Sequence, residues 1–349
     1  MSVATVRIGP LELPREGEVV VIAEAGVNHD GDPDLAHRLV DVAADSGADA
    51  VKFQTFDPDR LVSAAADATP YQRARGAAAG QRSLLASLTL PESVWAELRD
   101  HASERGTLFL STPFDLGSAE LLVGLGVPGL KVSSGELTNT PFLRELAALG
   151  VPLLVSTGMG SAAEVADAVE ACVEAPGTVL FHCVSAYPAP LEQCNLRAIP
   201  QMARAHGLPV GWSDHTTGLT SALGAVALGA SVLEKHVTTD RTRSGPDHAA
   251  SLEPGELTAY VAECRALARA LGDGTKRRVP AEEENAHLVR RSWHAVRDLA
   301  PGTVLAHDDV VLLRPEGGAA PSEVLVGRSL RTAVGAGAPV RTGDLEVGP

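Results

Sequence analysis

The sequence predicts an α/β fold, a (β/α)8 barrel followed by a small β-rich module. Short β-rich runs alternate with Ala- and Leu-rich stretches from residue 19 to about residue 240, as in a parallel sheet with helical crossovers. Eight such runs match the strand number of a barrel. A doubly wound sheet, the main alternative, would usually carry a glycine-rich phosphate turn after its first strand, but the sequence there reads Glu24-Ala25-Gly26-Val27-Asn28-His29. The barrel is therefore the favoured interpretation.

The expected strands are short apolar runs, each separated from the next by a stretch long enough for a crossover. They are Val19–Glu24, Ala50–Thr55, Thr107–Ser111, Gly129–Val132, Pro152–Ser156, Thr178–Val184, Val210–Ser213 and Val232–Val237. Amphipathic helices are expected between most of them, for example at Pro33–Ser46, Pro91–Arg105, Thr140–Leu149 and Ala162–Glu174. The segment Asp57–Leu90 is long for a strand-to-helix connection, so we expect a lid or binding loop there, with an idle insertion as the alternative.

A change of pattern after Leu271 divides the chain. We expect a barrel domain at residues 1–271, a linker at 272–288 and a small domain at 289–349. Within the small domain, Gly302 and Asp309 are seven residues apart, as are Gly337 and Asp344, and an apolar residue follows each aspartate. This echo predicts a pseudo-symmetric module of about 60 residues, which is too small to bury much core and should pack on something larger.

Composition excludes several classes of protein. The 349-residue chain has a formal net charge of −15 and no basic block, which argues against nucleic acid as a partner. No apolar run approaches the roughly 20 residues that cross a membrane. The first ten residues lack the basic and apolar regions of a signal peptide, and the four cysteines show no C-x-x-C spacing. We therefore expect a cytoplasmic protein with reduced thiols.

Polar or ionisable residues stand at the carboxyl ends of nearly all the expected strands, where barrel enzymes build their sites. The chain also has only four lysines among 29 basic residues, and three of them, Lys52, Lys131 and Lys235, lie in strand-like runs. A compact ammonium near a phosphate or carboxylate is one role that arginine does not fill in the same way, and a structural salt bridge is the alternative.

Two histidines at neighbouring strand ends indicate a metal site. Alternation along a strand places Ser213 and His215 on one face, and Glu234 and His236 on one face of the next strand. Two imidazoles with few other protein ligands suit an open divalent site that leaves positions for water and substrate. Glu234 could then hold a water or orient a ligand. Two hydrogen-bonded histidines without a metal are the alternative.

A ring of donors is expected across the barrel mouth, because a phosphate needs several donors and one or two cations held in place. Its members are Lys52, Lys131, Ser134, Ser156 and Ser213. Each serine alone is an ordinary start of a loop, but the set favours a phosphorylated ligand.

Ordered motifs along nearly the whole chain resemble the sialic acid synthase family. They are Ile22–His29, Val51–Thr55, Ser111–Phe114, Lys131–Glu136, Ser156–Met159, His182-Cys183, Tyr187-Pro188, Gly211–Thr216, Glu234–His236 and Gly245–His248. Val289–Leu345 is similar to that family's C-terminal antifreeze-like (SAF) module.

The resemblance implies a transferase reaction in which phosphoenolpyruvate condenses with the aldehyde of an open-chain 2-acetamido or 2,4-diacetamido hexose, such as N-acetylmannosamine. The products are a nine-carbon 2-keto acid, a nonulosonate, and phosphate, formed by C–O cleavage with a divalent metal that is typically manganese, with magnesium or cobalt as alternatives. The resemblance also implies a domain-swapped homodimer.

The resemblance also assigns roles by matching position. His215 and His236 would bind the metal, and Glu234 would assist them. Glu24 is a further candidate catalytic residue, and Glu136 is a candidate proton-transfer group. The phosphoenolpyruvate residues would be Lys52, Thr112, Lys131, Ser134, Ser156, Ser185 and Ser213. The sugar residues would be Glu24, Gln54, Tyr187, Asp247 and, from the other subunit, Arg314.

Two departures bear on the choice of sugar. Ser185 stands where some members carry asparagine, and the sugar-contacting asparagine that some members carry later in the long loop has no match from Gly76 to Arg82. Pro70-Tyr71-Gln72 in that loop resembles bacterial members. Two rival interpretations remain. One is a synthase for a phosphorylated aldose, which would need a second phosphate site, and the other is a non-catalytic binding or regulatory homologue.

Overall fold

The computed structural model describes residues 3–63 and 80–346. The chain forms two compact units, Met1–Asp273 and Gly274–Pro349. Within the described residues no helix has both the length and the apolar character needed to cross a membrane. Cys172, Cys183, Cys194 and Cys264 are buried free thiols.

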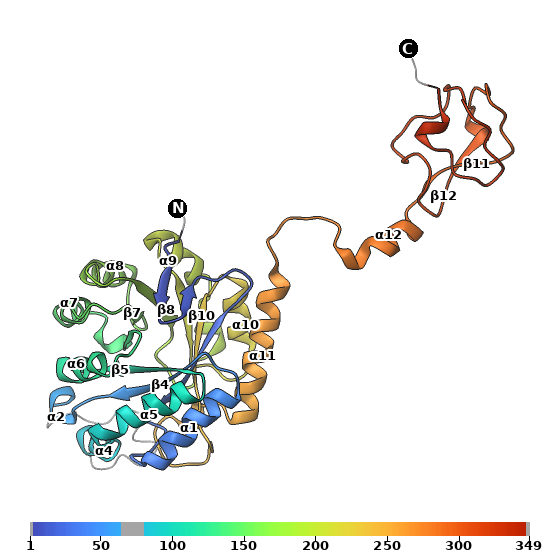
Figure 1. The fold of residues 1–349 in the computed structure, drawn as a ribbon. Coiled ribbons are helices and arrows are strands. Elements are labelled where there is room, and N and C mark those ends of the chain that lie inside the picture. The colour runs from blue at the N-terminus through green and yellow to red at the C-terminus, as the bar shows by residue number, and fades with distance from the viewer. Residues whose placement is uncertain (1–2, 64–79, 347–349) are drawn as a thin grey trace. The chain divides into compact units, whose positions relative to one another are not determined.

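The first unit is a closed barrel of eight parallel strands, which confirms the predicted fold class (Figure 1). The strands follow each other around the barrel in chain order, and the last pairs with the first. They are β3 (Val20–Gly26), β4 (Ala50–Thr55), β5 (Leu108–Pro113), β6 (Leu130–Val132), β7 (Leu153–Ser156), β8 (Thr178–Cys183), β9 (Val210–Asp214) and β10 (Val232–His236).

Helices surround the barrel and pack their apolar faces on the strands (Figure 1). They are α1 (Pro33–Asp45), α5 (Glu92–Glu104), α6 (Leu116–Gly124), α7 (Thr140–Ala148), α8 (Ala162–Ala171), α9 (Ala198–His206), α10 (Thr220–Ala227) and α11 (Pro254–Leu271). Local chemistry sets where they begin. For example, the Asp32 side chain accepts hydrogen bonds from the first backbone amides of α1, and Ser161 and Glu164 form a capping box on α8.

A short antiparallel hairpin, which the sequence pattern does not indicate, precedes the barrel. Strand β1 (Val6–Ile8) pairs with β2 (Leu11–Leu13). Val6, Ile8 and Leu13 are buried in one cluster with inward-facing strand residues such as Val20 and Phe181. These strand residues lie below the strand ends that carry polar groups, so the hairpin supplies the apolar floor of the barrel.

The long connection after β4 contains two short helices, α2 (Pro58–Leu61) and α4 (Gln81–Ser87). The predicted motif Pro70-Tyr71-Gln72 lies outside the described residues. Within the described residues, the expected lid or binding loop therefore consists of these two helices and the residues that flank them.

The second unit is a small β-rich body, as expected. Helix α12 (Glu283–Val289) begins in the segment expected to be a linker and ends one residue beyond it. It precedes strand β11 (Ser292–Ala295), which pairs antiparallel with β12 (Val310–Leu313). The sequence echo corresponds to repeated local structure. A 3-10 turn at His307–Asp309 and another at Thr342–Asp344 each end in an aspartate that accepts from the backbone amide three residues earlier.

Candidate active site

A cavity of about 400 Å³ opens where the barrel strands end. It brings together most of the residues singled out from the sequence, although they come from eight different strands or the loops that follow them. They are Glu24, Lys52, Gln54, Thr112, Lys131, Ser134, Ser156, Ser185, Tyr187, Ser213, His215, Glu234 and His236.

Three predicted residues lie elsewhere. Asp247 lines a second cavity that adjoins the first. Glu136 is not among the residues that line either cavity, and its carboxylate accepts a hydrogen bond from Asn139 at 2.8 Å. Arg314 is exposed in the second unit, directly after β12. The roles assigned to these three residues, like those of the residues in the first cavity, remain predictions.

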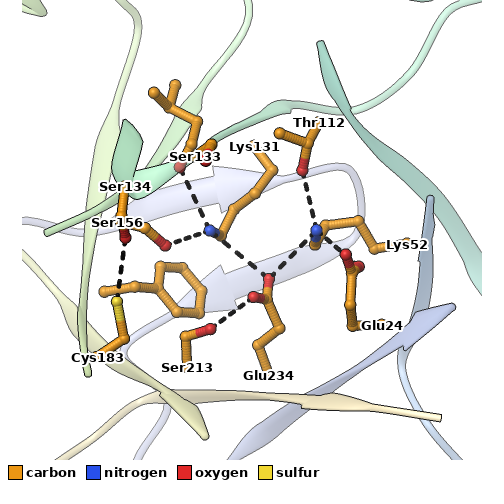
Figure 2. Close-up of polar contacts among 12 residues, drawn as sticks. Glu24, Lys52, Thr112, Lys131, Ser133, Ser134, Ser156, Cys183, Ser213 and Glu234 are labelled. Carbon is orange, nitrogen blue, oxygen red and sulfur yellow. Dashed lines mark hydrogen bonds and ion pairs between the residues drawn. The ribbon is translucent and has the colours of Figure 1, made fainter. Parts of the chain in front are cut away.

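Two buried lysines share one buried carboxylate at the centre of the first cavity (Figure 2). Glu234 Oε2 lies 3.7 Å from Nζ of Lys52 and 3.7 Å from Nζ of Lys131. Lys52 also pairs with Glu24 at 2.6 Å and donates to Thr112 Oγ1 at 2.9 Å. The two ammonium groups therefore face one region of the cavity, where an arriving anion would compete with Glu234 for them.

Hydroxyl groups surround these lysines (Figure 2). Lys131 donates to Ser156 Oγ, and Ser213 Oγ donates to Glu234 Oε1 at 2.7 Å. Ser134 Oγ accepts from the backbone amide of Gly158 at 3.0 Å. A Cβ at Gly158 would come within 2.8 Å of both Ser134 Oγ and Cys183 Sγ, so only glycine permits this close approach.

The two carboxylates of the cavity differ in ionisation. Burial raises the pKa of Glu24 to about 7, an effect that Lys52 opposes and the charge of Glu234 reinforces. Burial also opposes ionisation of Glu234, but the ammonium groups of Lys131 and Lys52 outweigh it and lower that pKa to about 2. Glu234 is therefore the constant anion of the site, whereas Glu24 can carry a proton near neutral pH.

The pKa values of the two lysines are also shifted in opposite directions. Burial lowers the pKa of Lys131, against the opposing charge of Glu234. Burial acts on Lys52 too, but Glu234 and Glu24 outweigh it and raise the pKa of that amine. Two carboxylates already stabilise the cationic form of Lys52. The pKa of Lys131 is lowered, so a further anion would stabilise the cationic form of this lysine more than that of Lys52.

His215 and His236 lie side by side, with ring centroids 5.7 Å apart. Nδ1 of His215 donates to the carbonyl oxygen of Val184 at 2.7 Å, which leaves the lone pair of the neutral ring on Nε2. Burial lowers the pKa of both imidazoles, that of His236 strongly. Both rings are therefore neutral near pH 7, the form that binds metal ions.

The donors at this point fit a divalent cation. Nδ1 of His236 and Oε2 of Glu234 are buried and have no hydrogen-bond partner. Imidazole nitrogen and carboxylate oxygen are ligands that divalent transition metals accept. Within the described residues, no group of three or more His, Cys, Asp or Glu side chains is arranged to hold an ion. A metal here would therefore rest on two imidazoles, with water and substrate completing its coordination.

The second cavity, of about 430 Å³, shares Gln54, Tyr187 and His236 with the first. Asp247 Oδ2 lies 4.0 Å from Nδ1 of His236, and burial raises the pKa of this aspartate to about 6. Gln54 donates to Glu24 Oε1 at 3.1 Å. The remaining wall is largely apolar and includes Val27, Phe56, Leu61, Leu85, Leu88 and Phe114.

Some lining residues were not predicted. Gln81, Phe114 and Ser133 line both cavities, and Met159 joins them at the first. Ser133, Phe114 and Met159 stand in motifs quoted for the family resemblance, so their neighbours in the sequence were a usable signal. Gln81 is the first residue of α4 in the long loop. Its side-chain amide comes from the region in which the sugar-contacting asparagine of some family members has no match.

The fold and the cavity define a barrel protein in which two buried lysines face one cavity, beside a second, partly apolar compartment. The family model described as the NeuB family matches residues 39–276, and the SAF domain model matches residues 290–346. The chain belongs to the NeuB family and is an enzyme of this family of nonulosonate synthases.

Relatives agree with this assignment. The N,N'-diacetyllegionaminic acid synthase of Campylobacter jejuni is 42% identical over 306 residues, which are 86% of this chain and 92% of that protein. The enzyme of the same name from Legionella pneumophila is 43% identical over 326 residues, 91% of this chain and 92% of that protein. The crystal structure of an N-acetylneuraminic acid synthetase from Leptospira borgpetersenii, in complex with citrate, has a TM-score of 0.71 and 33% identity, covering 81% of this chain and 95% of that chain.

Proposed function

We propose that this enzyme condenses phosphoenolpyruvate with an open-chain acetamido hexose to give a nine-carbon 2-keto acid and phosphate. The observation that carries the proposal is the pair of buried lysines that face one cavity, next to a compartment large enough for a sugar. A substrate with a phosphate and a carboxylate needs two cationic positions, which Lys131 and Lys52 supply.

The first cavity divides into a phosphate end and a carboxylate end. Lys131 would bind the phosphate together with hydroxyl donors around it, which are Ser134, Ser156, Ser185 and Ser213. Lys52 and Thr112, already joined by a hydrogen bond of 2.9 Å, would bind the carboxylate. Binding would draw the lysines toward the substrate, and the Glu234 carboxylate would remain as a hydrogen-bond acceptor for a water.

His215 and His236 would hold a divalent metal, most simply manganese, with magnesium or cobalt as alternatives. Such an ion polarises an aldehyde and orients water. The hydrogen bond from Nδ1 of His215 to Val184 directs the free lone pair of this ring into the cavity, as a ligand requires.

The second cavity would bind the sugar. Glu24, Gln54, Tyr187 and Asp247 would contact its hydroxyl and amide groups, with Gln81 as a further amide. Among the described residues that line this cavity there is no lysine or arginine, which disfavours a phosphorylated aldose. The apolar wall suits acetamido methyl groups, and two relatives are named for an N,N'-diacetylated product, so a 2,4-diacetamido hexose is favoured over N-acetylmannosamine.

The second unit would complete the sugar site of another copy of the chain. Arg314 is exposed at the end of β12, beside exposed apolar residues such as Leu313. A guanidinium offers planar donors to an amide carbonyl. We therefore propose a homodimer in which Arg314 of one copy reaches the acetamido group bound in the barrel of the other.

One experiment tests the function directly. The protein is incubated with phosphoenolpyruvate and manganese and with N-acetylmannosamine, a 2,4-diacetamido hexose or a 6-phosphorylated acetamido hexose, while phosphate release and product mass are followed. Phosphate release with a nine-carbon keto acid from the diacetamido sugar is the expected result. Release only with the phosphorylated sugar would replace the substrate assignment, and no sugar-dependent release from any of the three would contradict it.

A further inference from the structure

A buried ion pair lies directly behind the two histidines. Lys235 Nζ lies 3.3 Å from Asp214 Oδ2, and both side chains are fully buried. Asp214 belongs to β9 and Lys235 to β10, and the two residues pair with each other in the register of these strands. Each is next in sequence to a histidine of the site, so alternation turns the ion pair away from the cavity that the histidines line.

The pair holds the backbone on the carboxyl side of His215. Asp214 Oδ1 accepts hydrogen bonds from Thr216 N at 2.9 Å and from Thr216 Oγ1 at 2.7 Å. Lys235 donates to the carbonyl oxygen of Thr216. The residues on both sides of His215 are therefore fixed by one network, in which a donor from β10 reaches across to the chain that follows β9.

Two hydroxyl groups from the covering helices also donate to Asp214. Ser221 Oγ donates to Asp214 Oδ1 at 2.9 Å, and Tyr260 OH donates to Asp214 Oδ2 at 3.3 Å. Ser221 lies on α10 and Tyr260 on α11, so both helices that cover this side of the barrel take part. Both contacts fix the position of Asp214, and through it the chain segment that carries His215.

Stability alone is a weak reason for such a pair. Removing two charges from water is expensive, and well-packed apolar residues of similar volume often serve a fold equally well or better. A charged network is useful where geometry has to be specified, because its hydrogen bonds are directional. What this network specifies is the position of the two strand ends that present His215 and His236.

We propose that Asp214 and Lys235 are positioning residues that set His215, and through strand register His236, for a divalent cation. The inference rests on the metal role in the proposed function. It concerns residues that do not touch the cavity. Partners that orient a metal-binding histidine commonly change metal affinity by about 10- to 100-fold when they are removed.

The test measures the dissociation constant for Mn²⁺ without substrate, from the electron paramagnetic resonance signal of the free ion. Wild type is compared with Lys235→Met, with Asp214→Asn and with the milder variants Ser221→Ala and Tyr260→Phe. The control is Arg265→Met, which breaks an ion pair of 2.8 Å with Asp49, away from the histidines. A variant that folds only in part shows fewer sites per chain, whereas displaced ligands show a weaker dissociation constant.

We expect affinity to fall about 10- to 100-fold in Lys235→Met and Asp214→Asn, to fall less in Ser221→Ala and Tyr260→Phe, and to stay unchanged in Arg265→Met. Substrate-saturated kcat should recover in part at high Mn²⁺ in the weakened variants. Equal dissociation constants across the whole series, including the mild variants, would overturn the inference. If wild type itself binds no Mn²⁺ or related divalent ion, the metal part of the proposed function fails and this inference fails with it.

Discussion

Lys131 Nζ lies 3.7 Å from Glu234 Oε2, and both side chains are buried. A lysine whose pKa is lowered by burial is thus held beside a carboxylate whose pKa is lowered to about 2. The same carboxylate oxygen lies 3.7 Å from Lys52, so the two amines are kept together before any substrate binds. In the proposed function this arrangement preorganises the lysines for an anion, with Glu234 as the internal counterion.

Lys131→Met should weaken the use of phosphoenolpyruvate without unfolding the barrel. A hydrogen bond to a charged group contributes about 1.5–3 kcal/mol, so kcat/KM for phosphoenolpyruvate should fall about 10- to 100-fold. Steady-state kinetics with varied phosphoenolpyruvate measure the effect, and circular dichroism monitors the fold. Lys276→Met, at an exposed lysine of the linker, is the matched control and should behave as wild type. A Lys131 variant whose folded fraction has normal kinetics would point to a purely structural salt bridge.

Chelation should abolish turnover, and manganese should restore it. His215→Ala and His236→Ala should each lower kcat by several orders of magnitude, because an ion that polarises the aldehyde contributes several kcal/mol to the transition state. Assays after dialysis against a chelator, with and without added Mn²⁺, measure this. Full activity in exhaustively chelated protein would show that the reaction proceeds without a metal.

His29 should make stability depend on pH. Burial lowers the pKa of this imidazole to about 4, whereas it is near 6.5 in the unfolded chain. Between these two pH values His29 is protonated in the unfolded state but not in the folded state. Its contribution to stability is therefore complete above pH 6.5 and is lost as the pH falls toward 4. The loss is at most about 3 kcal/mol.

His29→Asn should remove this dependence, because asparagine does not titrate and keeps an acceptor near the Gly31 amide that His29 now satisfies. Urea unfolding at pH 7 and pH 4.5 measures the difference between variant and wild type. His287→Asn, at an exposed histidine, is the control. Parallel pH profiles for His29→Asn and wild type would refute the assignment.

Oxygen-18 at the bridging C–O position of phosphoenolpyruvate should leave with phosphate. Attack by C3 on the aldehyde develops positive charge at C2, water adds there, and the bond from C2 to the bridging oxygen then breaks. Mass spectrometry of phosphate and of the keto acid measures where the label goes. Label retained in the keto acid would mean cleavage of the P–O bond instead.

The barrel was predictable because each strand is a short apolar run bounded by turn residues. The run expected at Ala50–Thr55 coincides with β4, and the run expected at Pro152–Ser156 differs from β7 by one residue. The hairpin of β1 and β2 was missed for a physical reason. Its strands are three residues long and are stabilised by the barrel floor against which Val6 and Leu13 pack, rather than by their own pattern.

The site was predictable where it follows strand ends, since the fold places every such end at one mouth. Lys131 and Glu234 meet although they are 103 positions apart in the sequence (234 − 131). Gln81 was not predictable, because no periodicity fixes where a helix inside a long connection will lie. The hydrogen bond from Asn139 to Glu136 depends on local side-chain geometry that sequence does not specify.

Arg314 should act in the barrel of another subunit, and complementation between two inactive variants tests this. Arg314→Ala and His236→Ala should each be nearly inactive alone, since one lacks the proposed donor to the sugar and the other lacks a proposed metal ligand. In a swapped dimer that contains one chain of each kind, one site keeps both residues. Random exchange makes about half of the dimers mixed, so about a quarter of wild-type activity should return.

Two different affinity tags establish whether mixed dimers form, and the doubly tagged fraction is assayed separately. Arg341→Ala, at another exposed arginine of the same unit, is the control and should remain active alone. Activity in the doubly tagged fraction has one explanation within this design, because neither parent chain carries both residues and only an exchange of units between subunits unites them. Purified mixed dimers without activity would place Arg314 in its own chain's site or outside the reaction altogether.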